Sequence, residues 1–110
     1  MTTITPLAAC VAALLHLPPP DPLPAVTTWP QPMIAAATGK LGSTGASFPG
    51  LIVYAEGHPD SRLIIAHEMA HEIQRQNGLD PRAKSSENQA QWIERRVHAG
   101  WCSQSERNPP

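Results

Sequence analysis

The sequence predicts a small α+β domain, and three observations support that fold class. The chain has 110 residues, a length that suits one domain with a single hydrophobic core. A β-branched run at 51–54 lies between glycines, as in a strand, and two later segments carry apolar residues at helical spacing. We therefore expect an N-terminal helix and a proline-rich strap over residues 1–32, a folded domain over 33–102, and a disordered tail over 103–110.

The N-terminal segment 7–15 is apolar and is followed by five prolines between Pro18 and Pro24. Proline ends a helix and favours an extended backbone, so we predict a helix followed by a strap that crosses the core. The apolar run is shorter than the roughly 18 residues needed to span a bilayer. It also lacks the preceding positive charge of an export signal, since the first basic residue is Lys40. We expect a cytoplasmic protein, with export through an atypical signal as the alternative.

Net charge bears on the possible binding partners, and the cysteines bear on zinc binding and disulfide formation. The formal net charge is −1 and the chain has no basic cluster, so we predict no binding to nucleic acid or to anionic membranes. Cys10 and Cys102 stand near opposite ends of the chain and cannot form a thiolate zinc site by themselves. One long-range disulfide and two free thiols both stay open.

A small sheet is predicted before the two helices. Residues 33–38 can form a short strand, followed by a Gly/Ser/Thr-rich loop over 39–47. The next run is bounded by Gly50 and Gly57, and its β-branched and aromatic side chains favour a strand at the edge of the sheet. This predicted edge strand consists of Leu51, Ile52, Val53 and Tyr54.

The two segments with helical spacing are separated by helix-stopping residues. The first helix is predicted to begin at Asp60 or Ser61 and to end at about Asn77, because Gly78 favours a left-handed cap. The second is predicted to run from about residue 85 to residue 100. A short connection makes two such helices antiparallel neighbours.

His67, Glu68 and His71 form the pattern His-Glu-x-x-His inside the first of these helices. Residues four apart lie on one face of a helix, one turn apart, so both imidazoles can bind the same zinc ion. Glu68 stands about 100° round the helix from His67, beside the metal rather than among its ligands. From there it can accept a proton from activated water and pass it to a leaving amine. The pattern therefore predicts one zinc ion with Glu68 as the catalytic base.

A catalytic zinc usually has three protein ligands and one open position. We favour Glu87 as the third ligand, because it lies in the first turn of the second helix, where antiparallel packing would bring it opposite the histidines. Ala90, three residues later, is small enough to permit close approach of the helices. The other downstream candidates are Asp80, Glu94 and His98.

With these residues the sequence resembles the gluzincin group of zinc metallopeptidases. The gluzincin pattern is His-Glu-x-x-His followed by Glu-x-x-Ala on a later helix, which here is residues 87–90. The resemblance covers about residues 50–98 and includes the minimal single-domain gluzincins and the short metallopeptidase domains of phage and prophage regions. It implies a zincin-like fold, a general base at Glu68, and zinc ligands at His67, His71 and Glu87.

The sequence departs from the gluzincin pattern at one position and leaves one role unassigned. Where the family has Asp or Asn after the alanine, this chain has Gln91. We expect Gln91 to orient a zinc-binding histidine through its amide oxygen, without the charge of a carboxylate. The residue that stabilises the oxyanion is not assigned, and the candidates are Tyr54, His58 and His98.

Together these observations predict a small zinc metallopeptidase of the endopeptidase kind. Its substrate would be a peptide or unfolded protein, aligned along residues 51–54 through main-chain hydrogen bonds. Two alternatives belong to other classes: a zinc-stabilised structural or interaction module without turnover, and an interaction protein whose strap is the functional part. The strap or a second copy of the chain could also occupy the cleft and keep the enzyme inactive. The oligomeric state is not predicted.

Overall fold

A computed structural model describes residues 4–103, and its architecture is α+β, as predicted. The predicted disordered tail lies outside the described residues except for Ser103. The elements in chain order are α1 (Thr5–Leu15), β1 (Ala25–Trp29), α2 (Gln31–Thr38), β2 (Gly45–Phe48), β3 (Leu51–Ala55), α3 (Ser61–Gln76) and α4 (Lys84–His98).

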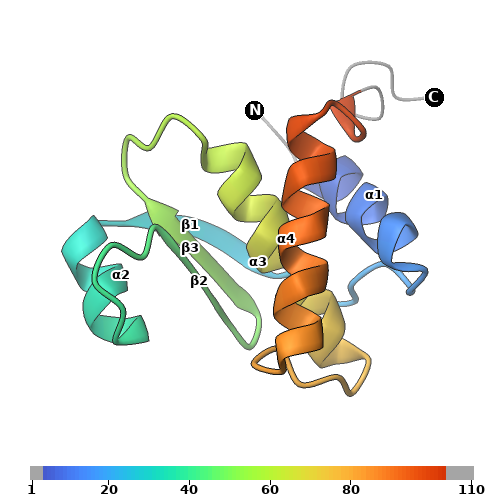
Figure 1. Cartoon of the computed structure of the whole chain (residues 1–110), viewed down its shortest axis with the longest axis horizontal. Helices are drawn as coiled ribbons and strands as arrows, with labels where there is room; N and C mark the ends of the chain where they lie inside the picture. The colour runs from blue at the N-terminus through green and yellow to red at the C-terminus, as the bar shows by residue number, and fades with distance from the viewer. Residues whose placement is uncertain (1–3, 104–110) are drawn as a thin grey trace.

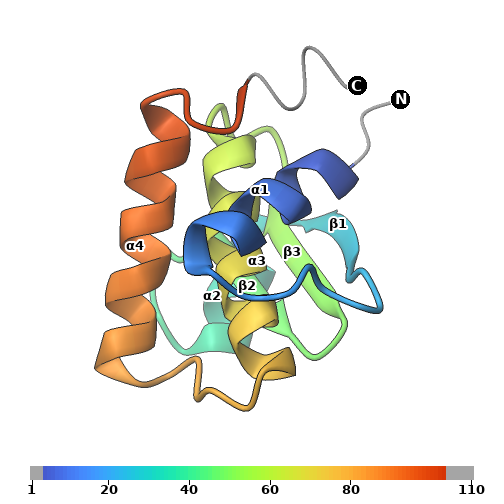
Figure 2. The same ribbon diagram turned by 90° about the vertical axis from the view of Figure 1, so that its right-hand side faces the viewer.

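The sheet lies between helices on both faces (Figure 1). Helix α2 covers one face, α3 covers the other, and α1 and α4 pack around α3 (Figure 2). Alternate residues of β3 enter different cores, since Ile52 belongs to the cluster with α1, α3 and α4. Val53 and Ala55 instead pack with Ile34 of α2. The strand β3 is therefore buried on both of its faces.

The predicted edge position of residues 51–54 is wrong. The strand order is β1-β3-β2, with β1 parallel and β2 antiparallel to β3, so β3 is the central strand. Residues 25–29, which the prediction includes in the strap, form β1 because their Val-Thr-Thr-Trp run suits a pleated strand. Residues 45–48, assigned to a loop, form the edge strand β2 next to α3.

The predicted strand at 33–38 is also wrong, because these residues belong to α2. Pro30 is the N-cap and Pro32 lies in the first turn, where the lack of an N–H costs no hydrogen bond. Three consecutive alanines follow, and alanine has the highest helix propensity. Here proline begins a helix instead of preventing one.

The other predicted helices are confirmed. Helix α1 contains the predicted segment 7–15, and α3 has Asp60 as its N-cap residue. Gly78, just after α3, has a φ of +78°, the left-handed conformation expected of a stop. The facing sides of α3 and α4 share one buried cluster, which includes Met69, Ala70, Ile73, Ala90, Ile93 and Val97.

Cys10 and Cys102 form a disulfide, which resolves the alternative that the sequence left open. It joins α1 to the segment that follows α4, with the two Cα atoms 5.8 Å apart. Among residues 4–103, no helix has the length and apolar character needed to cross a membrane.

Candidate metal centre

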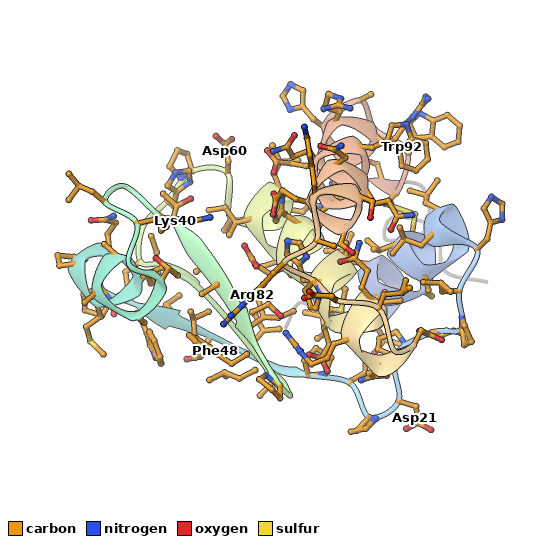
Figure 3. The ribbon with its side chains drawn as sticks, turned by 60° about the horizontal axis from the view of Figure 1, so that its bottom comes forward. Asp21, Lys40, Phe48, Asp60, Arg82 and Trp92 are labelled. Atoms are coloured by element: carbon orange, nitrogen blue, oxygen red, sulfur yellow. A yellow bond between two sulfur atoms is a disulfide. The ribbon has the colours of Figure 1, made fainter. Side chains whose placement is uncertain are left out.

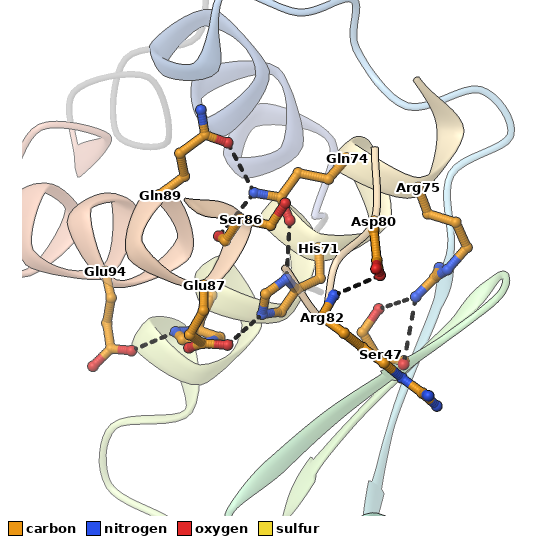
Figure 4. Close-up of polar contacts among 11 residues, drawn as sticks. Ser47, His71, Gln74, Arg75, Asp80, Arg82, Ser86, Glu87, Gln89 and Glu94 are labelled. Atoms are coloured by element: carbon orange, nitrogen blue, oxygen red, sulfur yellow. Dashed lines mark hydrogen bonds and ion pairs between the residues drawn. The ribbon is translucent and has the colours of Figure 1, made fainter. Parts of the chain in front are cut away.

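Helices α3 and α4 bring three potential metal ligands together (Figure 4). His67 and His71 project from adjacent turns of α3, and Glu87 projects from the first turn of α4. Glu87 Oε1 lies 3.0 Å from His67 Nε2, and Glu87 Oε2 lies 3.2 Å from His71 Nε2. All three ligand atoms lie within 4.8 Å of one another. Of the four downstream candidates, Glu87 alone has oxygens close to both Nε2 atoms.

The other nitrogen of each imidazole has its own partner. Glu94 Oε1 lies 2.9 Å from His67 Nδ1, and Gln74 Oε1 lies 3.0 Å from His71 Nδ1. The Gln74 amide nitrogen donates to the Ser86 carbonyl, so the amide oxygen is the atom that faces His71. Each ring can therefore donate its Nδ1 proton to this partner when a cation occupies Nε2.

This donor set fits a cation. Two imidazole Nε2 atoms and a carboxylate face one another, and none of these groups offers a proton to the others when the ring protons are on Nδ1. Such an arrangement is stabilised by a positive ion between the three groups. The described residues therefore include a three-residue donor set that could hold a divalent metal.

The expected contact of Gln91 with a histidine is absent from the described residues. Gln91 is exposed, and Glu94 is the α4 residue that contacts His67. The helical repeat explains the difference, since residues four after Glu87 are rotated by about 40° and residues seven after it by only about 20°. The carboxylate that the sequence lacks at 91 is thus supplied one turn later.

Glu68 lies beside this cluster in a half-buried position. Its pKa is raised to about 7, mainly by burial and to a smaller extent by the nearby α4 carboxylates. His67 and Lys40 act in the opposite direction. Burial also lowers the pKa of His71, which favours the neutral imidazole that a metal binds. Glu68 can therefore hold or release a proton near neutral pH.

A cleft of about 1030 Å³ opens onto the three ligands and Glu68. One wall is β2 with the loop before it, and the other wall is α3 with the first turns of α4. Lys40, Phe48 and Arg82 stand at its borders (Figure 3). The cleft is large enough to accept a segment of extended peptide.

The free edge of β2 faces this cleft. The N–H of Ala55 donates to the carbonyl of Thr44, and the next pair in the antiparallel register is Gly45 with Tyr54. Hydrogen-bonded and non-hydrogen-bonded pairs alternate, so the main-chain groups of Gly45 and Ser47 point away from β3. Both residues line the cleft, where their N–H groups are available to another chain.

Gly45 is a site residue that the sequence interpretation missed. A Cβ atom at this position would lie 2.3 Å from Ile64 Cγ2 and 3.2 Å from Glu68 Oε2. Only glycine lets the edge strand approach α3 this closely. Four glycines between 39 and 50 look alike in the sequence, so no local signal could single out Gly45.

The three oxyanion candidates and the alternative ligand Asp80 lie in different surroundings. His58 lines the cleft, and its Nδ1 accepts the N–H of Asp60, so the neutral ring carries its proton on Nε2. Tyr54 pairs with Gly45 in the sheet but is not among the cleft-lining residues. His98 is exposed at the end of α4, and Asp80 accepts the N–H of Arg82 in the connection before α4. His58 is therefore the oxyanion candidate that borders the cleft.

The fold and the site define a small α+β protein with a candidate metal centre between two helices. Comparisons with protein-family profiles, with curated proteins and with solved structures give no match.

Proposed function

We propose that this protein is a small zinc-dependent peptidase of the gluzincin kind. The observation that carries the proposal is the convergence of two imidazole Nε2 atoms and one carboxylate beside a half-buried glutamate. Zinc is bound in catalytic sites by three protein ligands of this type, at distances of about 2.0–2.2 Å. Here one ligand atom from each of the three residues lies within 4.8 Å of the others.

The three ligands and Glu68 then each have a role in hydrolysis. Zinc held by His67, His71 and Glu87 would supply Lewis acidity, which activates water near neutral pH. Glu68 accepts a proton from the water that attacks the carbonyl carbon. The same carboxyl returns the proton to the amide nitrogen as the C–N bond breaks.

The substrate in this proposal is an extended peptide that pairs with the edge of β2. Gly45 and Ser47 direct main-chain N–H groups to the cleft side, and Gly45 lies next to Glu68. The carbonyl of Ser47 already contacts the Arg75 guanidinium. Strand addition of this kind reads the peptide main chain and is tolerant of sequence. This arrangement replaces the predicted alignment along 51–54, since those residues are already paired on both sides.

Metal content and cleavage of a denatured protein such as casein test this proposal together. We expect one zinc per wild-type chain, substantial loss of zinc in Glu87→Ala, and retained zinc without cleavage in Glu68→Gln. Glu56→Gln is the matched control, because Glu56 is exposed and outside the cleft. Cleavage by Glu68→Gln at the wild-type rate would refute the peptidase. Bound zinc with no cleavage by wild type would favour the non-catalytic module.

The disulfide bears on the compartment in which the protein works. Disulfides persist in oxidising compartments and are rare in the cytosol. The Cys10–Cys102 bond therefore favours export over the cytoplasmic location that we expected from the sequence. Thiol titration of protein isolated from its native host without reductant would test this, and two free thiols would refute it.

A further inference from the structure

Gln74 is a buried polar residue that the mechanism above does not use. It follows His71 by three residues on α3, and its exposed fraction is 0%. Buried amides persist where hydrogen bonds satisfy them, and Gln74 has partners for both ends of its amide group. One of those partners is a metal-binding histidine.

The orientation of this amide is fixed from the α4 side (Figure 4). Gln74 Nε2 donates to the carbonyl oxygen of Ser86 at 3.0 Å and to Gln89 Oε1 at 3.0 Å. A main-chain carbonyl only accepts, so a flipped amide would bring two oxygens into contact at Ser86. Gln74 Oε1 must then face His71 Nδ1, which lies 3.0 Å away.

This orientation provides an acceptor for the metal-binding tautomer of His71. The other ring nitrogen, Nε2, faces the Glu87 carboxylate, so without a cation either nitrogen can carry the proton of the neutral ring. A metal at Nε2 requires that proton on Nδ1, and the amide oxygen of Gln74 is placed to accept it there. Gln74 thus stabilises the tautomer that binds a metal.

The same side chain connects the two helices that supply ligands. Ser86 and Gln89 flank Glu87 at the start of α4, whereas Gln74 and His71 belong to α3. The hydrogen bonds of one amide therefore fix His71 and the turn that carries Glu87 relative to each other.

We propose that Gln74 is a positioning residue that holds His71 in its metal-binding tautomer and Glu87 at the correct distance. The inference rests on the proposed zinc site. Gln74 differs from Glu94, the partner of His67, in two ways. It is neutral, and it belongs to α3 and is hydrogen-bonded to α4, whereas Glu94 belongs to α4.

Gln74→Met tests this role, since methionine keeps the length and unbranched shape of the side chain and removes both kinds of hydrogen bond. We expect zinc affinity, measured by competition with a chelator, to fall 10- to 100-fold. In NMR spectra of the zinc-loaded full chain, the Nδ1–H signal of His71 should lose its protection from exchange while that of His67 keeps it. A residue that only fills space would not change this signal. Gln91→Met is the matched control, because Gln91 is exposed on α4, and its affinity should equal that of wild type.

The outcomes separate the inference from the zinc site itself. Unchanged zinc affinity with a retained His71 signal in Gln74→Met would overturn the role of Gln74 and leave the metal site intact. A wild-type chain that binds no zinc would refute the site and the inference together. If Gln74→Met does not fold, Gln89→Met removes one anchor of the amide at an exposed position. That variant should lose zinc affinity several-fold, and wild-type affinity would also overturn the inference.

Discussion

The carboxylate of Glu94 lies 2.9 Å from Nδ1 of His67, on the side of the ring opposite Glu87. Helix α4 therefore contacts this one imidazole at two levels, through residues two turns apart. A carboxylate in this position orients the ring and increases the basicity of its metal-binding nitrogen. This contact and the Gln74 contact give each histidine a separate partner, one charged and one neutral.

The first prediction concerns the contact between Glu94 and His67. Glu94→Ala should weaken zinc binding about 10- to 100-fold, because His67 loses its orienting acceptor. Glu94→Gln should weaken it less, since an amide oxygen still accepts the proton of Nδ1. Competition with a chelator measures both effects. Gln91→Asp is the control and should stay within about twofold of wild type, because Gln91 is exposed away from the histidines. A larger effect at 91 than at 94 would contradict the contact.

The second prediction concerns the close approach at Gly45. Gly45→Ala introduces a Cβ at 2.3 Å from Ile64 Cγ2, so either β2 moves away from α3 or the Ile64 side chain shifts. We expect a loss of about 1–3 kcal/mol in the free energy of unfolding and a larger relative loss of cleavage, because the edge strand leaves Glu68. Ile64→Ala removes the clashing atom. In a double-mutant cycle by urea denaturation, the pair should therefore be less destabilised than the sum of the single changes. Additive effects would show that the two residues do not clash.

The third prediction follows from the pKa of Glu68. Burial raises it from 4.5 to about 7 in the folded protein. The folded state thus binds this proton more tightly than the unfolded state does. The favourable contribution is complete below pH 4.5, and it is lost as the pH rises through 7. Above that pH the ionised, buried carboxylate costs roughly 3 kcal/mol.

Glu68→Gln removes this cost. In the presence of a metal chelator, the variant should unfold at a higher temperature than wild type at pH 8.5, and the two should converge near pH 4.5. Thermal unfolding followed by circular dichroism measures the difference. Glu56→Gln should not alter the pH profile, because Glu56 is exposed. A stability difference for Glu68→Gln that is independent of pH would rule out the raised pKa as its cause.

The fourth prediction concerns the Cys10–Cys102 bond. The two cysteines are 92 residues apart, so their cross-link restricts nearly the whole unfolded chain. Its removal should cost about 2–4 kcal/mol of stability. Wild type in reductant and the Cys10→Ala/Cys102→Ala variant should both show the same lowered midpoint of thermal unfolding. Zinc affinity should change little below that midpoint, since Glu87 lies at the opposite end of α4. Equal midpoints with and without reductant would contradict a stabilising bond.

The parts of this protein that the sequence determined are local. The His67–His71 spacing, the extent of α3 and the stop at Gly78 depend on neighbours within one or two helical turns. The patterns at 7–15 and 85–100 are equally short-range, and they predicted α1 and α4 to within two residues at each end of α4. Helix formation and helix ends depend on residues close together in the sequence, so these elements could be identified before the tertiary structure was known.

Only the tertiary structure decided which residues from different elements meet. The sequence favoured Glu87 but could not choose Glu94 over Gln91, because that choice depends on how α4 is rotated against α3. It also could not reveal that Gln74 is held by Ser86, or that β1 and β2 enclose β3. These contacts arise from packing between segments far apart in the chain. Burial and strand pairing, which no short pattern encodes, therefore decide the surroundings of the His-Glu-x-x-His helix.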